Sequence, residues 1–480
     1  MICSRLLHLA LSAVGGLASA MPKQPMVVAR VSDGTSDMGN NTFLSIPMER
    51  VQLSSGQSLR RRDDVNTVVY PVSDAGYAIE IDVGTPTQRV PVLIDTGSDE
   101  LWVNPDCSGL SDSVAKQACL VLGQYFPSDS TTADDPKDSS LLEYGKGSAN
   151  VTYIVDSVSI PGAMRNLSMT DVTLGVATAS KNLAIGILGV GFTSNVEYLT
   201  VLDKLDAQNE MQSRAFSLVL GASNATDEAP ASDGTIIFNG VDTRKFTGPL
   251  QQLDNLSPQD GDDDRWRYFV ELTNSTYAKK DKTNTTTTLY SSSLRVLLDS
   301  GSSYSYLPPS FIGALANTLN LTVSTTSSST TINGTIAIDC KATVPTGMVD
   351  FAFGSALTIS VPLADLIWVN GDVCMIGIEP IGDDKIAVLG DDFLRSAYVL
   401  FDQDNQKIYM AEAANCGTHA QLLVGTISGN ITSYNYTGEC NQSTADLQVS
   451  ASASAAAVFP ISLTTVLFAF ACIQIMMAMM

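Results

Sequence analysis

Histidine is almost absent from this 480-residue chain, which contains only His8 and His419. Serine and cysteine hydrolases use a histidine as the base that activates their nucleophile. His8 lies in a leader-like segment, and no nucleophile motif accompanies His419, which we expect to be an ordinary surface residue. A histidine-rich metal site is excluded as well. The sequence therefore predicts no metal and no cofactor.

Basic residues are also scarce. The chain has 27 Lys and Arg against 50 Asp and Glu, for a net charge of −23. The first 62 residues hold seven of the basic residues and three of the acidic ones, which leaves 20 basic and 47 acidic residues in the remainder. We expect an acidic, monomeric protein with no nucleic-acid partner.

The N-terminus is typical of a secretory signal. Arg5 is followed by an apolar run from Leu6 to Leu17 and by the small residues Ala18-Ser19-Ala20. This run is too short for a spanning helix and is broken by Gly15-Gly16. We therefore predict a signal peptide over residues 1–20.

The next segment ends in a basic cluster. Residues 21–62 finish with Arg60-Arg61-Arg62, which is followed by Asp63-Asp64. We predict a pro-segment that a processing protease of the secretory pathway removes by cutting at Arg61-Arg62. The alternative is a solvated charge run on the surface.

The C-terminus lacks charge, since no charged residue follows Asp446. Small and polar residues precede an apolar tail that runs to Met480, which is the pattern of a GPI anchor signal. We predict that residues 447–480 are removed and that the anchor joins Ser443, Asn441 or Ser450. A single spanning helix is the alternative, although the basic cytoplasmic flank usual for one is missing. The expected location is the cell surface, at the plasma membrane or in a cell wall.

Two short motifs carry the predicted chemistry. The first is Val92-Leu93-Ile94-Asp95-Thr96-Gly97-Ser98, and the second is Val296-Leu297-Leu298-Asp299-Ser300-Gly301-Ser302. In each motif an apolar run typical of a buried strand ends in a turn that presents an Asp. A lone motif of this kind is often only a capped turn. Two of them indicate a duplicated architecture that brings the two carboxylates face to face.

Paired carboxylates can perform acid–base chemistry. Two such groups about 3 Å apart share one proton, so one acts as an acid and the other as a base. Together they can activate a water molecule and protonate a carbonyl oxygen. We expect Gly97 and Gly301 to allow close approach of the backbone. We also expect Ser98 and Ser302 to donate hydrogen bonds to the outer carboxylate oxygens.

At these residues the chain resembles the pepsin-type aspartic proteases. The first motif is followed by Leu101-Trp102-Val103, as in that family, and Tyr144-Gly145-Lys146-Gly147-Ser148 resembles its flap. Ile187-Leu188-Gly189 and Val388-Leu389-Gly390 resemble the elements that pack behind each catalytic loop. Asp95 lies 94 positions before Gly189, and Asp299 lies 91 positions before Gly390, which indicates an internal repeat.

The resemblance implies roles for individual residues. It makes Asp95 and Asp299 the catalytic pair and Tyr144 the flap residue that closes over a peptide. Thr96 and Ser300 would cross-link the two loops by hydrogen bonds, and Trp102 would bond to Tyr144 or serve only as a core residue. The fold implied is all-β and bilobed, with the active-site cleft between two related β lobes.

Short alternating strands with Gly, Pro and Asp turns support that fold. Brief helices are expected at Pro309 to Leu319 and after Asp391. We place an N-terminal lobe at residues 63–245, a C-terminal lobe at 246–415, and a polar, glycosylated segment at 416–446.

Six of the eight cysteines lie between the predicted leader and the apolar tail, an even number that indicates three disulfides. Cys107–Cys119 would close a short loop. Cys340–Cys374 corresponds, by the resemblance, to a bridge of the second lobe, and Cys416–Cys440 remains by elimination. Asn-x-Ser/Thr sites predict a glycosylated surface, with acceptors at Asn150, Asn166, Asn224, Asn255, Asn274, Asn284, Asn320, Asn333, Asn430, Asn435 and Asn441.

The combination of leader, pro-segment, paired Asp motifs and anchor signal resembles the yapsins, the cell-surface aspartic proteases of fungi. That resemblance implies protein or peptide substrates cleaved near basic residues, which the acidic pair Asp99-Glu100 would favour by charge attraction. Lys146 on the flap would oppose this preference, and Glu143 would compensate. Two other functions stay open here, namely a non-catalytic adhesion protein on the same fold and a soluble digestive protease.

Overall fold

The protein is described from a computed structural model. The description covers residues 43–51, 76–110, 116, 119–120, 122–134, 136, 138–145, 147–162, 166–193, 196–221, 234–259, 265–279, 285–323, 334–338, 347–370, 373–381, 386–428 and 431–445. The predicted signal peptide, the processing site at Arg61-Arg62, the flap residue Lys146 and the apolar tail lie outside these residues.

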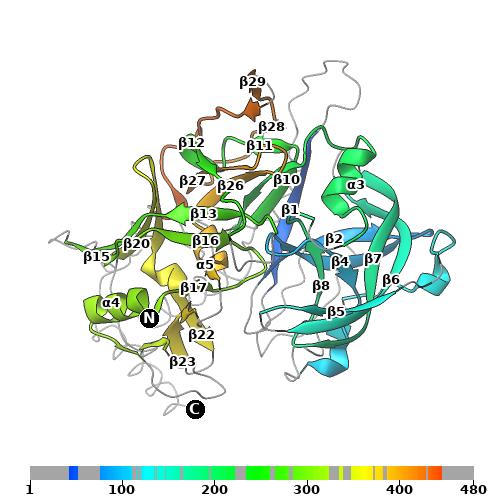
Figure 1. The fold of residues 1–480 in the computed structure, drawn as a ribbon, viewed down its shortest axis with the longest axis horizontal. Helices are drawn as coiled ribbons and strands as arrows, with labels where there is room; N and C mark the ends of the chain where they lie inside the picture. The colour runs from blue at the N-terminus through cyan, green and yellow to red at the C-terminus, as the bar shows by residue number, and fades with distance from the viewer. Residues whose placement is uncertain are drawn as a thin grey trace, which may run out of the picture. The chain divides into compact units, whose positions relative to one another are not determined.

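The described residues form an all-β body with two lobes, as predicted (Figure 1). The first lobe holds one end of a 13-stranded sheet. Its strands are β2 (Gly76–Val83), β3 (Gln88–Asp95), β4 (Leu101–Val103), β5 (Ser139–Glu143), β6 (Ser148–Ile160), β7 (Leu167–Lys181) and β8 (Gly186–Gly189). Buried and solvent-facing residues alternate along most of β6, which is the pattern of a strand with one face on the core.

The other end of the same sheet links the two lobes. Its strands are β1 (Leu44–Val51), β9 (Ala215–Val219), β10 (Gly234–Phe238), β12 (Phe246–Asp254), β26 (Ala397–Asp402) and β27 (Lys407–Ala413). β1 lies within the predicted pro-segment and pairs with both β10 and β2. This part of the predicted pro-segment is therefore a strand of the sheet.

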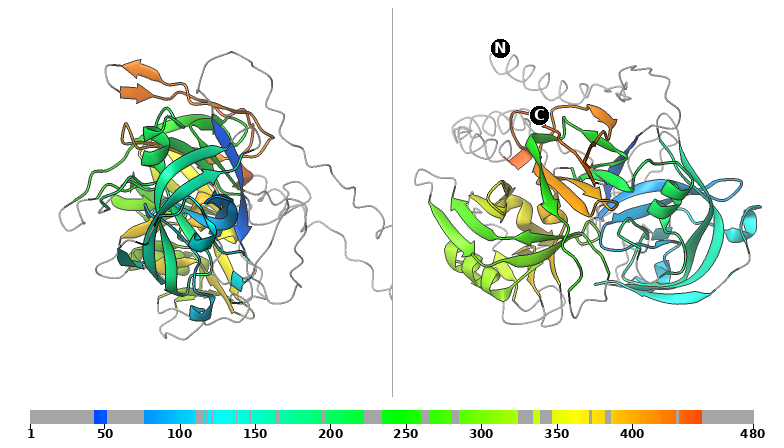
Figure 2. Two further views of the ribbon diagram at one scale, coloured as in Figure 1. Left: turned by 90° about the vertical axis from the view of Figure 1, so that its right-hand side faces the viewer. Right: turned by 45° about the horizontal axis from the view of Figure 1, so that its top comes forward.

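The second lobe consists of three smaller sheets, which lie apart from the first-lobe strands in the right-hand view of Figure 2. The first has the strand order β13 (Phe269–Leu272), β16 (Leu294–Leu298), β25 (Ala387–Leu389), β17 (Ser305–Leu307) and β24 (Ile378–Pro380). The second has the order β15 (Thr286–Tyr290), β14 (Asn274–Lys279), β20 (Gly347–Phe353) and β21 (Leu357–Pro362). The third has the order β18 (Thr322–Val323), β19 (Ile336–Ile338), β23 (Val373–Ile376) and β22 (Ile367–Asn370).

The described helices are short. They are α3 (Val201–Ala207), α4 (Pro309–Leu319) and α5 (Asp391–Leu394), together with 3-10 turns at η1 (Cys107–Gly109), η2 (Pro127–Asp129) and η3 (Leu363–Leu366). α4 matches the predicted helix, begins with a Pro at its first position and ends at Asn320 in the left-handed conformation. Within the described ranges, no helix is both long and apolar enough to cross a membrane.

The internal repeat is visible in strand pairing. β3 pairs in parallel with β8, which places Asp95 opposite Gly189. β16 pairs in parallel with β25 in the second lobe, and the Asp299 amide donates to the carbonyl of Leu389. The predicted apolar-Gly elements therefore do pack behind the two Asp loops.

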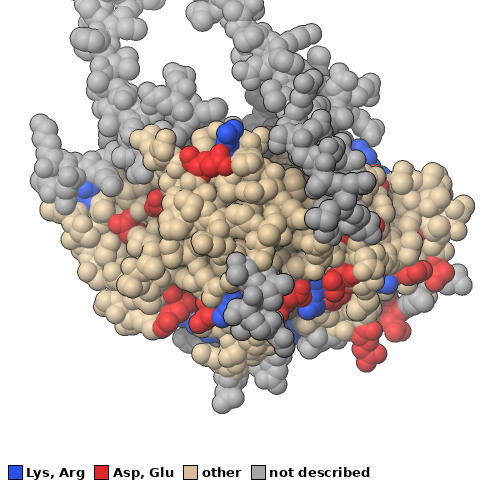
Figure 3. Space-filling view, turned by 90° about the horizontal axis from the view of Figure 1, so that it is seen from above, with Lys and Arg blue, Asp and Glu red and all other residues tan. Residues whose placement is uncertain are grey.

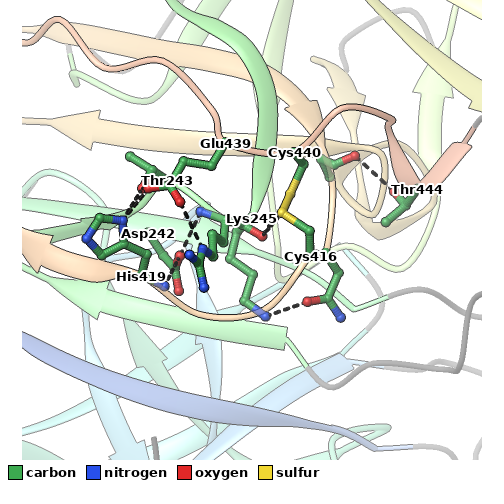
Figure 4. The surroundings of a disulfide bond; sticks show 11 residues. Asp242, Thr243, Lys245, Cys416, His419, Glu439, Cys440 and Thr444 are labelled. Atoms are coloured by element: carbon green, nitrogen blue, oxygen red, sulfur yellow. Dashed lines mark hydrogen bonds and ion pairs between the residues drawn. A yellow bond between two sulfur atoms is a disulfide. The ribbon is translucent and has the colours of Figure 1, made fainter. Parts of the chain in front are cut away.

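The C-terminal segment is fixed to the body by the Cys416–Cys440 disulfide (Figure 4). Glu439 accepts hydrogen bonds from Thr243 (2.7 Å) and Arg244 (2.8 Å) and contacts His419. These bonds, that of Thr243 first, lower the pKa of Glu439 to about 2. His419 is exposed, as expected for a surface residue, and it also belongs to this contact network.

The remaining strands of this segment extend along the body and away from it. β28 (Ala420–Leu422) pairs with β11 (Gly240–Asp242), while β29 (Thr426–Ser428) and β30 (Ile431–Ser433) form a hairpin that projects outward (orange in Figure 2).

On the face in Figure 3, Asp and Glu side chains gather along one edge of the body, with single Lys and Arg between them.

The disulfide predictions are confirmed where the described residues allow a test. Cys107–Cys119 and Cys416–Cys440 are bonded, and Cys374 is also in a disulfide. Cys340, the predicted partner of Cys374, lies outside the described residues.

One glycosylation prediction is wrong. Asn255 is only 6% exposed, its Oδ1 accepts a hydrogen bond from the Phe269 amide, and its Nδ2, the atom that would carry the glycan, is buried. Exposed acceptors are Asn150, Asn166, Asn320, Asn435 and Asn441, and Asn274 is half-buried. Outside the described residues lie Asn224, Asn284, Asn333 and Asn430.

A buried carboxyl group predicts how stability depends on pH. Asp392 of α5 is 2% exposed, and burial raises its pKa to about 6, although hydrogen bonds from Ser305 and the charge of Arg395 act in the opposite direction. Below about pH 3 the group is neutral in both folded and unfolded chains. As pH rises through about 6, the unfolded chain gains more from ionisation, so the folded state loses about 3 kcal/mol from this group.

We therefore expect Asp392→Asn to remove this contribution. The difference in the free energy of unfolding between about pH 3 and pH 7 should shrink by about 3 kcal/mol, measured by urea unfolding. Asp129→Asn, at an exposed aspartate, is the matched control and should leave the difference as in the parent protein. An unchanged difference in the Asp392 variant would contradict the assignment.

Candidate active site

The two Asp loops meet at the centre of the body and are cross-linked by hydrogen bonds. The Thr96 hydroxyl donates to the Leu298 carbonyl (2.9 Å) and accepts from the Ser300 amide (2.9 Å). In the symmetric half, the Ser300 hydroxyl donates to the Ile94 carbonyl (2.8 Å) and accepts from the Thr96 amide (3.2 Å). The expected cross-link is present, and both side chains are buried. It holds the two loops at a fixed separation.

Each carboxyl group is held by its own loop. Oδ1 of Asp95 accepts from the Gly97 amide (2.8 Å), and Oδ1 of Asp299 accepts from the Gly301 amide (2.9 Å). The Ser98 hydroxyl donates to Oδ2 of Asp95 (2.5 Å), as predicted. The two glycine amides thus hold the two carboxyl groups in the same way.

The prediction for Ser302 is wrong. Its hydroxyl donates to the carbonyl of Tyr304 (2.9 Å) and not to Asp299. The Ser302 carbonyl accepts from the Asp391 amide, which fixes this residue in the turn behind the loop. The support of the two carboxyl groups is therefore asymmetric.

The glycines allow the two carboxyl groups to approach each other. A Cβ atom on Gly97 would lie 2.6 Å from Oδ1 of Asp299, and one on Gly301 would lie 2.3 Å from Oδ1 of Asp95. Both separations are shorter than any real Cβ contact. Each Asp therefore occupies the space that a side chain on the opposite glycine would need.

The pKa of Asp299 is raised well above the ordinary aspartate value. Burial is the largest cause, and the negative charge of Asp95 is the next. The Gly301 amide and the charge of Arg267 lower it, and a hydrogen bond between the two carboxyl groups adds to the rise. A raised pKa on one of two touching carboxyl groups is what a shared proton requires. The pair can thus supply one base and one acid at the same place.

The pair lies in a cleft of about 800 Å³ lined by both lobes. Its walls include the first loop from Asp95 to Glu100, the second loop from Asp299 to Ser303, and the hairpin tip at Tyr144. A volume of this size is in the range of clefts that take an extended organic ligand.

The predicted flap is a hairpin over this cleft. β5 and β6 are joined by a turn in which the Tyr144 amide donates to the Gly147 carbonyl (2.8 Å). Nε1 of the fully buried Trp102 donates to the Tyr144 hydroxyl (2.8 Å), as expected. Burial first, and the charge of Asp95 second, raise the pKa of Tyr144, so its hydroxyl stays neutral.

We expect Tyr144→Ala to lower kcat by about 10- to 100-fold, because the hairpin tip loses its anchor and admits water. Tyr144→Phe keeps the ring and loses only the hydroxyl, so its loss should be smaller. The melting temperature should change little, since the ring is only half-buried. Equal kcat in the parent and the Ala variant, in a standard peptide assay, would contradict this role.

The partners of Glu100, and two arginines of the cleft, were not found from the sequence. Glu100 accepts hydrogen bonds from the hydroxyls of Tyr153 (2.5 Å) and Tyr198 (2.5 Å), which come from distant parts of the chain. Arg265 and Arg267 line the same cleft. The sequence carried no motif for these residues, because only the folded strands bring them to the cleft.

The sequence of this chain is similar to those of known aspartic proteases. A family model described as eukaryotic aspartyl protease matches residues 76–413. The chain is 31% identical over 386 residues to the probable aspartic-type endopeptidase opsB of Aspergillus oryzae, covering 76% of this chain and 74% of that protein. It is 30% identical over 396 residues to aspartic proteinase yapsin-3 of Saccharomyces cerevisiae, covering 77% and 73%.

A solved structure has a similar fold. The aspartic proteinase from Irpex lacteus matches with a TM-score of 0.55 and 16% sequence identity, covering 78% of this chain and 98% of that one. At this identity the match concerns the fold alone.

Proposed function

This chain belongs to the eukaryotic aspartyl proteases and is a yapsin-like aspartic endopeptidase, and we propose that Asp95 and Asp299 carry its chemistry at the cell surface. Membership of this family implies protein or peptide substrates. The observation that carries the proposal is the contact of two carboxyl groups in a cleft shared by both lobes.

The proposed reaction is direct hydrolysis. A water molecule between the carboxyl groups loses a proton to the ionised one and attacks the peptide carbonyl carbon. The protonated carboxyl donates its proton to the carbonyl oxygen, which gives a neutral tetrahedral intermediate. Collapse of that intermediate, with a proton passed to the amine, breaks the C–N bond. The flap residue Tyr144 would hold the peptide and exclude other water.

We propose that the enzyme is made as a secreted precursor. The signal pattern over residues 1–20 supports this, and so do the disulfides of the body, which form in oxidising compartments. Cleavage at Arg61-Arg62 would remove the segment that includes β1 from the central sheet. Changing both arginines to Ala should make a larger precursor accumulate, whereas a mature enzyme of normal size would refute the processing site.

We propose a GPI anchor at the C-terminus. Ser443 is a poor attachment residue because it is 2% exposed, and Thr444 next to it donates to the Ala413 carbonyl (3.2 Å). Asn441 is exposed but directly follows the bonded Cys440. Ser450, which lies outside the described residues, is therefore our first choice. Release of activity from cells by phosphatidylinositol-specific phospholipase would support the anchor, and a retained apolar tail with no release would contradict it.

We also propose a preference for basic residues near the cleaved bond. Asp99, Glu100 and Glu143 all line the cleft, which gives one wall a negative charge. Scoring a peptide library for residues on each side of the cut tests this, with Glu100→Gln as the matched variant. A preference for large apolar residues, unchanged in the variant, would refute it.

A further inference from the structure

The cleft carries positive charge as well as negative charge. Among its described lining residues, Arg265 and Arg267 are the cations, and both come from the segment just before β13. The other charged lining residues are acidic: Asp95, Asp99, Glu100, Glu143 and Asp299. Two arginines in the wall would repel basic side chains, so a preference for basic residues alone does not account for them.

Strand pairing brings the segment that follows Arg267 to the strand that leads into the second Asp loop. β13 and β16 lie side by side as an antiparallel pair (Figure 1), with Phe269 opposite Leu297. The Leu298 amide continues this contact by donating to the Tyr268 carbonyl (3.0 Å). Arg267 directly precedes this contact, and the chain bends there, because the Phe269 amide donates to the Arg267 carbonyl (2.8 Å). Arg267 lines the cleft together with Asp299.

Electrostatics agrees with this placement. The charge of Arg267 is one of the influences that lower the pKa of Asp299, against the larger effect of burial. Such an influence on a group beside the cleft needs the guanidinium to lie close to it.

The backbone that carries Arg267 is held firmly. Tyr268 is fully buried, donates to the Val190 carbonyl (2.7 Å) and accepts from Nε2 of Gln403 (2.8 Å). Val190 in turn donates from its amide to the carbonyl of Asp95 (2.9 Å). On the other side, the Trp266 ring lies 6.2 Å from that of Phe192. Arg267 is thus presented from a rigid segment that is tied to both Asp loops.

We propose that Arg267 determines specificity by binding an acidic side chain of the peptide close to the cleaved bond. This inference rests on the proposed function, since it requires a peptide in the cleft. The planar guanidinium has five N–H donors, so it can serve more than one acceptor and bind a carboxylate through two hydrogen bonds. Because Asp99, Glu100 and Glu143 also line the cleft, the preferred substrate would carry an acidic residue at one position and a basic residue at another.

The test compares peptides that differ by one charge. Asp is exchanged for Asn at each of several positions on both sides of a fixed cleavage site, and kcat/KM is measured for each pair. We expect the parent enzyme to favour Asp at one position by about 10-fold or more, as a charged hydrogen bond allows. In Arg267→Gln this ratio should fall to near one, and in Arg267→Glu a Lys peptide should be favoured there.

A matched control removes a different arginine of the same sheet. Arg295 of β16 stacks on the Phe269 ring at 3.4 Å and does not line the described cleft, so Arg295→Gln should keep the Asp preference. A parent enzyme that shows no Asp preference at any position, or a preference that survives in Arg267→Gln, would overturn the inference. The parent ratio alone decides the case if the variants fail to fold. Failure of the parent to cleave the Asn peptides would instead refute the proposed function.

Discussion

Asp95→Asn and Asp299→Asn should each reduce peptide hydrolysis by about 10⁴-fold or more, because each change removes one of the two proton-transfer roles. An amide side chain fits the same space and keeps the backbone hydrogen bonds from Gly97 or Gly301. It cannot share a proton with the opposite carboxyl group. The loss should therefore appear in kcat, with the fold intact.

The two single variants and the double variant should be almost equally inactive, since the carboxyl groups act as a unit. Circular dichroism and the melting temperature check that the variants fold. Ser98→Ala is a useful companion, because it removes only the hydrogen bond to Oδ2 of Asp95 and should cost far less. Turnover close to that of the parent in either Asn variant would refute the mechanism.

Gly301→Ala should be nearly as damaging, with a loss in kcat/KM of about 100-fold or more. The added methyl group would lie 2.3 Å from Oδ1 and 2.5 Å from Cγ of Asp95. Asp95 is fixed by Gly97 and Ser98, so either the carboxyl group or the loop must shift. A shift of this size separates the two carboxyl groups and ends the sharing of a proton.

Gly313→Ala is the matched control for that change. Gly313 lies within α4 and an added Cβ would meet no atom within 4 Å. This variant should keep full activity and gain up to about 1 kcal/mol in stability from its better helix propensity. Full activity in Gly301→Ala would contradict the close approach of the two loops.

The fold and the pair could be predicted because their signals are local and repeated. An apolar strand that ends in Asp, a hydroxyl residue and Gly occurs twice, and each copy has its own apolar-Gly partner strand. The cross-link between Thr96 and Ser300 and the bond from Trp102 to Tyr144 then followed from the resemblance.

The remaining features depend on contacts between distant residues. Arg267 lines the cleft with Asp299 only because the chain folds back beside β16 and bends before β13, which no sequence pattern predicts. Asn255 fits the glycosylation pattern, but the fold buries its side chain. Ser302 matches Ser98 in the motif, yet a different turn after it directs its hydroxyl to Tyr304.

The most direct test of the paired carboxyl groups is the dependence of kcat/KM on pH. The active form has one proton on the pair, so activity should fall at low pH, where both groups are protonated, and at high pH, where both are ionised. Because burial and the charge of Asp95 raise the pKa of Asp299, the high-pH limb should lie above the ordinary range of an aspartate. The account predicts this bell-shaped profile. A rate that keeps rising through neutral pH would contradict it.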